Sequence, residues 1–130
     1  HDEIGYNYRM PNINAALGCA QLEKMDIFLA QKKQLLTKYE QLISNLSGVC
    51  LFKQPIHSES NYWLQTLIIN ESLNRDEILN ILNFNGIMSR PIWKPLHKLI
   101  MYKESPRMNL SIIENLERCI INIPSTPLIK

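Results

Sequence analysis

Two short stretches of the sequence hold side chains whose types and spacing could do chemistry. The first is Tyr6-Asn7-Tyr8-Arg9, which stands directly before a predicted helix. The amide of Asn7 and the forked guanidinium of Arg9 both suit phosphate oxygens, and the two tyrosines add hydroxyl groups. These residue types allow a phosphate-binding site. The simpler alternative is a polar turn that caps the following helix.

The second stretch is the segment from Arg90 to Lys98 (RPIWKPLHK), with Tyr102 close behind. It combines cations, an indole, an imidazole and prolines that hold a loop in a fixed shape. A surface that contacts a sugar or a nucleotide uses such groups. The alternative is an exposed loop in which Trp93 folds inward.

The rest of the sequence supplies no self-contained active site. The three histidines are far apart and lack the spacing of metal ligands. The sequence contains no Ser-His-Asp, HExxH or glycine-rich phosphate-loop pattern, and four glycines are too few for the usual nucleotide-cradling loop. These features alone favour a binding or accessory module over a complete enzyme, and they predict no metal site.

Length and composition set the class of protein. The chain of 130 residues fits one modest domain, and 45% hydrophobic with 20% charged residues is typical of a globular protein. No apolar run is long enough for a membrane span, and a net charge of +2 is too small to indicate a nucleic-acid or membrane partner. Three widely spaced cysteines, Cys19, Cys50 and Cys119, have apolar neighbours and no CxxC pattern, which favours buried free thiols and a cytoplasmic location.

Two consecutive helices are predicted directly after the stretch Tyr6-Asn7-Tyr8-Arg9 and must position it. The first is predicted from about Ala15 to Met25, with Asn12 or Asn14 as its cap, and its small residues suit close packing against another element or subunit. The second is predicted from about Asp26 to Leu46, where apolar residues recur at steps of three and four. Its lysines, Lys32 among them, are expected largely on the solvated face.

Short strands and two further helices are predicted around the stretch from Arg90 to Lys98 and must position it. Strands are predicted at Val49–Phe52, at Tyr62–Ile69, at Ile87–Ile92 with Pro91 marking an edge position, and at Cys119–Ile123. A helix capped by Asn74 with Glu77 ends at Asn85-Gly86. Another opens on a capping box of Ser111 with Glu114 and runs to about Arg118. The order predicts an α/β or α+β module with a small sheet of about three to four strands.

At this point the residues resemble a known family. The run from Gly5 to Pro11 (GYNYRMP), followed by Ala15-Ala16-Leu17-Gly18 and Gln21-Leu22-Glu23, closely resembles a signature of the DegT/DnrJ/EryC1/StrS aminotransferases. The segment RPIWKPLH is similar to the substrate loop of that family, and CIINIPS (119–125) is similar to its closing segment. The matches extend over most of the chain in the family's order.

The resemblance implies the C-terminal part of a fold-type-I enzyme that uses pyridoxal 5'-phosphate and works as a homodimer. Residues 1–25 would end the large cofactor-binding domain and residues 26–130 would form the small domain. In this family the Schiff-base lysine, the aspartate on the pyridine nitrogen and the stacking aromatic lie upstream of the opening motif. The chain alone is therefore expected to be inactive and to hold no catalytic residue.

The resemblance also assigns roles to individual residues. Asn7 would bind the cofactor phosphate of the neighbouring subunit, and Arg9 would face the nucleotide-sugar, with Tyr8 beside it. His97 would contact the sugar or its diphosphate, and Trp93 and Arg90 would line the entrance.

The reaction that the resemblance implies is transfer of an amino group from glutamate to a nucleotide-linked 4-keto sugar, for bacterial surface glycans. The particular sugar, its nucleotide and the stereochemistry stay open. A different class of function also stays open, namely a non-catalytic interaction or carbohydrate-binding module that uses the loop from Trp93 to His97. That alternative has no use for Asn7 and Arg9.

Overall fold

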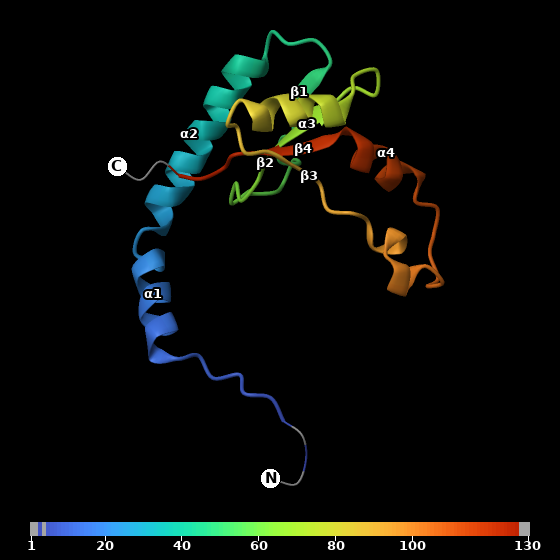
Figure 1. The fold of residues 1–130 in the computed structure, drawn as a ribbon. Helices are drawn as coiled ribbons and strands as arrows, with labels where there is room; N and C mark the ends of the chain where they lie inside the picture. The colour runs from blue at the N-terminus through green and yellow to red at the C-terminus, as the bar shows by residue number, and fades with distance from the viewer. Residues whose placement is uncertain (1–2, 4, 128–130) are drawn as a thin grey trace.

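A computed structural model describes residue 3 and residues 5–127 of the chain, so the outer ends of the two predicted domains, at residues 1 and 130, lie outside the described residues. Two consecutive helices lead into a small sheet with further helices around it (Figure 1). The elements are α1 (Asn12–Leu22), α2 (Met25–Ile43), β1 (Val49–Leu51), β2 (Gln65–Ile69), α3 (Arg75–Phe84), β3 (Arg90–Pro91), the 3-10 turns η1 (Leu96–Lys98) and η2 (Ile100–Tyr102), α4 (Ser111–Cys119) and β4 (Ile120–Ile123).

The sheet has the strand order β1-β2-β4-β3, and every neighbouring pair is antiparallel. Leu67 in β2 lies opposite Leu51 on one side and Ile121 on the other. Because side chains alternate between the two faces of a strand, these residues share one face, and all three are buried there. The same face carries Ile69 and Ile123, which complete the core cluster.

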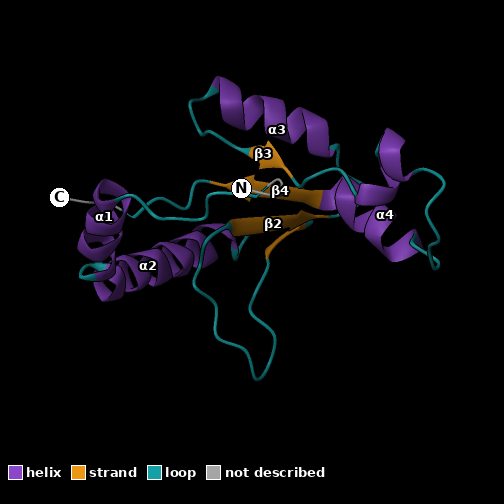
Figure 2. Cartoon of the chain, turned by 90° about the horizontal axis from the view of Figure 1, so that it is seen from below, coloured by secondary structure: helices purple, strands orange, loops and turns teal. Residues whose placement is uncertain are grey.

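Helices α2 and α3 both pack on the apolar core cluster of the sheet. In Figure 2, α3 lies above the strands and α2 lies to their lower left. Burying a side chain such as Ile121, which is fully inaccessible, contributes roughly 1.5–3 kcal/mol. The side chains that α2 and α3 pack on this cluster are apolar or aromatic: Leu36, Tyr39 and Ile43 from α2, and Ile78, Leu79 and Leu82 from α3.

Helix α3 begins and ends where its sequence predicts. The Asn74 side chain accepts hydrogen bonds from the backbone N–H groups of Asp76 and Glu77, at 3.1 and 3.2 Å. At the other end Gly86 has a φ of +79°, and the Ile87 N–H donates to the Leu82 carbonyl at 2.9 Å. This is the left-handed glycine end of a helix, which satisfies carbonyls that the helix itself leaves free.

Several predicted boundaries are wrong: the strand predicted at Ile87–Ile92 is only Arg90–Pro91, and α1 and α2 each end three residues earlier than predicted. Two further boundaries are wrong for local reasons. Helix α1 begins at Asn12, and Pro11 occupies its N-cap position without a side-chain cap, so neither Asn12 nor Asn14 caps it. The proline has an extended backbone and lacks an N–H, which suits it to that position without a capping side chain. Strand β2 starts three residues later than predicted, because Tyr62 has a left-handed φ of +52° that no strand can continue.

Helix α1 is largely exposed within the described part of the chain. It contributes no buried residue, and Ile13, Leu17 and Leu22 are 82%, 61% and 66% exposed. Cys19 of this helix is exposed, as is Cys50, so the prediction of buried thiols is right for Cys119 alone. The predicted close packing of its small residues therefore finds no partner element here.

None of the helices in residues 3 and 5–127 combines the length and apolarity that crossing a membrane requires.

The buried face of α2 corrects the prediction that Lys32 is solvated. Lys32, Leu36, Tyr39 and Ile43 are spaced by four, three and four residues, so they line one side of the helix. The Lys32 ammonium donates to the carbonyls of Tyr62, at 3.2 Å, and Ser125, at 2.6 Å. The spacing of apolar residues predicted a solvated Lys32. The prediction is wrong because the Lys32 ammonium extends past the core and donates to backbone carbonyls.

Tyr39 makes a matching contact two turns further along α2. Its hydroxyl donates to the Pro124 carbonyl at 3.0 Å. Burial raises the pKa of the Tyr39 phenol and lowers the pKa of the Lys32 ammonium, since both charged forms lose water there. Helix α2 thus binds the segment that follows β4 at two neighbouring carbonyls.

We expect Lys32→Met to lower the free energy of unfolding by about 1.5–3 kcal/mol, because two carbonyls would lose a charged donor. Urea unfolding followed by circular dichroism measures this change. Lys33→Met is the matched control, since Lys33 is the next residue of the same helix and is exposed. Equal losses in the two variants would contradict the role of the Lys32 contacts.

Candidate functional site

The predicted phosphate cluster lies on an extended arm that precedes α1. The Asn7 side-chain oxygen accepts a hydrogen bond from the Arg9 backbone N–H at 3.0 Å, which closes a small local turn. The side chains of Asn7, Tyr8 and Arg9 are exposed. The turn does not cap α1, which starts at Asn12, so the polar-turn alternative is right about the turn and wrong about the capping.

Arg90 lies on the edge strand β3, where Pro91 follows it. It pairs with Asn122 of β4, so its side chain is on the face of the sheet opposite the core. On that face the Thr66 hydroxyl donates to the Asn122 side-chain oxygen at 2.8 Å. The edge position that Pro91 predicts is therefore confirmed, and it leaves Arg90 exposed.

Trp93 lies two residues beyond β3 and is not folded inward. It is 64% exposed and stacks against Trp63, with ring centroids 6.0 Å apart and ring planes tilted by 33°. This separation is within the range in which aromatic pairs attract one another, by about 0.5–1.5 kcal/mol. The pair presents two indoles, from distant parts of the sequence, on one surface.

The backbone around Trp63 is held on both sides. The carbonyl of Tyr62, in its left-handed conformation, accepts a hydrogen bond from Lys32, and the carbonyl of Trp63 accepts one from the Ser125 hydroxyl at 2.6 Å. The Trp63 N–H donates to the Asn61 side chain at 3.0 Å. These bonds offset the cost of the unusual Tyr62 backbone and fix the direction in which the Trp63 indole leaves the chain.

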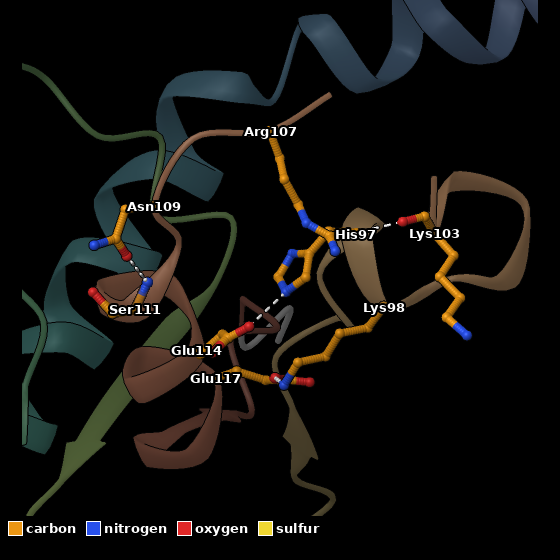
Figure 3. Close-up of polar contacts among 8 residues, drawn as sticks. All are labelled: His97, Lys98, Lys103, Arg107, Asn109, Ser111, Glu114 and Glu117. Carbon is orange, nitrogen blue, oxygen red and sulfur yellow. Dashed lines mark hydrogen bonds and ion pairs between the residues drawn. The ribbon is translucent and has the colours of Figure 1, made fainter. Parts of the chain in front are cut away.

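His97 lies in η1 and contacts helix α4. Its Nε2 lies 3.0 Å from a side-chain oxygen of Glu114, and only 14% of the His97 side chain is exposed (Figure 3). The next residue, Lys98, pairs with Glu117, one turn further along α4. Two consecutive residues of the loop are therefore attached to two acidic side chains on one face of α4.

The contact of Glu114 shows that the predicted capping box is wrong. Ser111 is the first residue of α4 rather than its cap, and its N–H donates to the Asn109 side chain at 3.0 Å (Figure 3). Because Asn109 supplies the acceptor that the helix start needs, Glu114 is released from the capping role that the S-x-x-E spacing indicated.

An open pocket lies beside His97, between the loop and the start of α4. Its volume is about 500 Å³, and its walls are mostly apolar. Arg107 lines it together with His97, and one guanidinium N–H of Arg107 donates to the Lys103 carbonyl at 3.0 Å (Figure 3). An apolar cavity with a few polar groups at its wall is the usual form of a small-molecule site.

The structure brings only some of the predicted site residues together. Arg90, Trp93 and His97 follow one another along β3 and the loop after it, whereas the arm with Asn7, Tyr8 and Arg9 extends away from the sheet, apart from that loop (Figure 1). Prediction from sequence missed Trp63, Arg107 and Glu114. No group of three or more His, Cys, Asp or Glu side chains among residues 3 and 5–127 is placed to hold a metal ion.

Comparison with known proteins identifies the class. The model of the DegT/DnrJ/EryC1/StrS aminotransferase family matches residues 1–130. The chain belongs to this family, and its relatives match it with their C-terminal part, so the resemblance of its motifs is confirmed.

Two relatives are GDP-perosamine synthases. The one from Escherichia coli O157:H7 is 38% identical over 132 residues, which cover 98% of this chain and 34% of the relative. The one from Vibrio cholerae is 35% identical over 135 residues, which cover 98% of this chain and 35% of the relative. The chain thus spans about a third of the length of the curated relatives it matches.

Solved structures show the same fold. Helicobacter pylori PseC, an aminotransferase involved in the biosynthesis of pseudoaminic acid, superposes with a TM-score of 0.87 at 20% identity, over 99% of this chain and 36% of PseC. DesI, solved with its TDP-sugar product, gives a TM-score of 0.87 at 23% identity, over 97% of this chain and 33% of DesI. The predicted fold, a C-terminal part of an aminotransferase with a long helical segment and a small sheet, is confirmed.

We expect the stacked indoles to give an exciton couplet in the circular dichroism spectrum, because coupled transitions require the short separation of Trp63 and Trp93. Trp63→Phe should abolish the couplet, and so should Trp93→Phe. Phe84→Leu is the control, since the Phe84 side chain is 92% exposed and belongs to α3. A couplet that survives either tryptophan substitution would show that the two rings do not stack.

Proposed function

We propose that the protein carrying this chain is a pyridoxal-phosphate-dependent aminotransferase that transfers an amino group, from glutamate, to a nucleotide-linked 4-keto sugar for bacterial surface glycans. The observation that carries the proposal is the family match over residues 1–130, together with relatives whose names describe sugar amination. Three relatives named GDP-perosamine synthase, at 34–38% identity over 94–98% of this chain, favour a GDP-linked sugar.

The cofactor contact of this chain is assigned to Asn7. When bound, pyridoxal phosphate supplies the electron sink for the chemistry, and the protein supplies position and electrostatics. The geometry of the arm fits a phosphate contact: the Arg9 N–H occupies the Asn7 side-chain oxygen, which leaves the amide NH₂ as the group that can donate to a phosphate oxygen. The Schiff-base lysine is assigned to a part of the protein outside this chain.

The arm is proposed to serve the neighbouring subunit of a cytoplasmic homodimer. Its support is that the arm extends away from the loop of its own chain, so the two groups of predicted residues meet only if another surface joins them (Figure 1). Residues 1–25 would then end the large domain and residues 26–130 would form the small one. The turn at Glu23-Lys24, between α1 and α2, lies just before that proposed boundary.

The substrate contacts are assigned to exposed cations and aromatics. Arg9, with Tyr8 beside it, would face the nucleotide-sugar from the arm, and Arg90 with Trp93 would line the entrance. His97 would contact the sugar or its diphosphate. Support comes from the exposure of Arg90 and Trp93 and from the position of His97 at the wall of the pocket.

We expect the full-length protein to aminate a GDP-linked 4-keto-6-deoxy sugar faster than its dTDP-linked counterpart, with glutamate as donor. Formation of the amino sugar is followed by mass spectrometry. A protein from which residues 90–98 are replaced by a glycine-serine linker is the control for background transfer. Absence of amination with every nucleotide-linked keto sugar tested would overturn the proposed function and favour a non-catalytic carbohydrate-binding module.

We expect Asn7→Ala in the full-length protein to weaken retention of pyridoxal phosphate by about 1.5–3 kcal/mol, because one hydrogen bond to a charged group is lost. Fluorescence titration of the cofactor into apoprotein measures the change. Asn14→Ala, on the exposed side of α1, is the matched control. Preference among nucleotide-sugars should stay the same, and an unchanged cofactor affinity would remove Asn7 from the cofactor site.

A further inference from the structure

The orientation of the His97 ring depends on one contact. Its Nε2 lies 3.0 Å from the Glu114 carboxylate, with 14% of the His97 side chain and 39% of the Glu114 side chain exposed. An ionised carboxylate can only accept hydrogen bonds, so the hydrogen must be on Nε2 of the imidazole. The ring therefore leaves Nδ1 as the atom that is available to a ligand.

Helix α4 is built to hold Glu114 in this position. The Asn109 side chain accepts from the Ser111 N–H at the start of the helix, which removes the need for Glu114 to reach back. One turn later, Glu117 pairs with Lys98, the residue that follows His97. The two acidic side chains thus attach η1 to α4 at adjacent residues (Figure 3).

The ring that Glu114 orients lies at the wall of the pocket of about 500 Å³. Arg107 lines the same pocket and is itself held by the Lys103 carbonyl, at 3.0 Å. The pocket therefore combines the guanidinium of Arg107 with the imidazole that Glu114 contacts. A ligand that enters it meets an imidazole already held by Glu114, so that ordering this ring costs little side-chain entropy.

We propose that Glu114 is a positioning residue for His97: it places the proton on Nε2 and thereby presents Nδ1 to the nucleotide-sugar. The proposal rests on the proposed function in so far as it takes the nucleotide-sugar as the ligand of His97. Glu114 does not touch the ligand and acts through the imidazole alone. Its removal frees the ring to take either tautomer and to rotate.

The test uses the full-length protein labelled with ¹⁵N-histidine, and His97→Asn assigns the His97 signals. At pH 9, above the usual titration range of imidazoles, two-bond ¹H–¹⁵N spectra report the tautomer. We expect the Nε2–H form of His97 in the wild-type protein and a mixture in Glu114→Ala. Glu114→Gln, which keeps the size of the side chain, should also give a mixture, because an amide can either accept from Nε2 or donate to it.

Glu117→Gln is the matched control. It weakens the neighbouring Lys98 contact on the same face of α4 and should leave the His97 tautomer unchanged. If Glu117→Gln shifts the tautomer as much as Glu114→Ala does, the effect is a general loosening of the loop and the proposal is overturned. A wild-type ring in the Nδ1–H form, or a tautomer that Glu114→Ala leaves unchanged, also overturns it.

Binding of GDP, measured by calorimetry on the same proteins, connects the tautomer to the ligand. We expect Glu114→Ala to weaken GDP binding about 3- to 10-fold, the effect of one misdirected hydrogen bond, and Glu117→Gln to weaken it less. Unchanged GDP affinity in Glu114→Ala overturns the step from tautomer to ligand. If GDP does not bind the wild-type protein while the tautomers behave as stated, the positioning role is supported and the GDP preference within the proposed function is contradicted.

Discussion

The structure depends on the attachment of α2 to the two chain segments at one end of the sheet. Lys32 bonds to a carbonyl that precedes β2 and to a carbonyl that follows β4, and Tyr39 bonds to the Pro124 carbonyl beside the latter. These segments are neighbours because β2 and β4 are antiparallel. Their backbone groups have left the sheet there and need other partners. Helix α2 supplies those partners from the same face on which Leu36 and Ile43 pack against the core. Apolar packing and polar hydrogen bonds therefore fix one orientation of the helix.

The same attachment determines where the exposed indoles lie. The carbonyl that Lys32 holds belongs to Tyr62, whose backbone is left-handed, and the next residue is Trp63. The Ser125 hydroxyl holds the Trp63 carbonyl, while the Ser125 carbonyl is held by Lys32 in turn. The partly buried Lys32 thus helps to fix the position of the exposed Trp63 through Tyr62 and Ser125. The loop after β3 is positioned independently, through the two acidic residues of α4, and it meets Trp63 where Trp93 stacks on it.

Local patterns in the sequence predicted the elements, and long-range polar contacts are what they missed. The cap of α3 and the glycine at its end were predictable because both features act within four residues. The edge position of β3 followed from the lack of an N–H in Pro91. Lys32 and Glu114 were placed wrongly because their partners lie 93 and 17 residues away, respectively. The resemblance of motifs identified the family, whereas no pattern in the sequence indicated the contact of His97 with Glu114 or that of Trp93 with Trp63.

The described chain is not uniform in how its parts are supported. The sheet and the helices on its apolar face share a core of five buried aliphatic residues, while α1 exposes most of Ile13, Leu17 and Leu22 and the arm before it is held by a single local turn. Apolar side chains exposed along one helix are typical of a surface that packs against another. The region with the least internal support carries Asn7 and Arg9, whereas His97 contacts Glu114 and Trp93 stacks on Trp63. The proposed sharing of the site between subunits accounts for this difference, since an arm with little support in its own chain would take its shape from the partner.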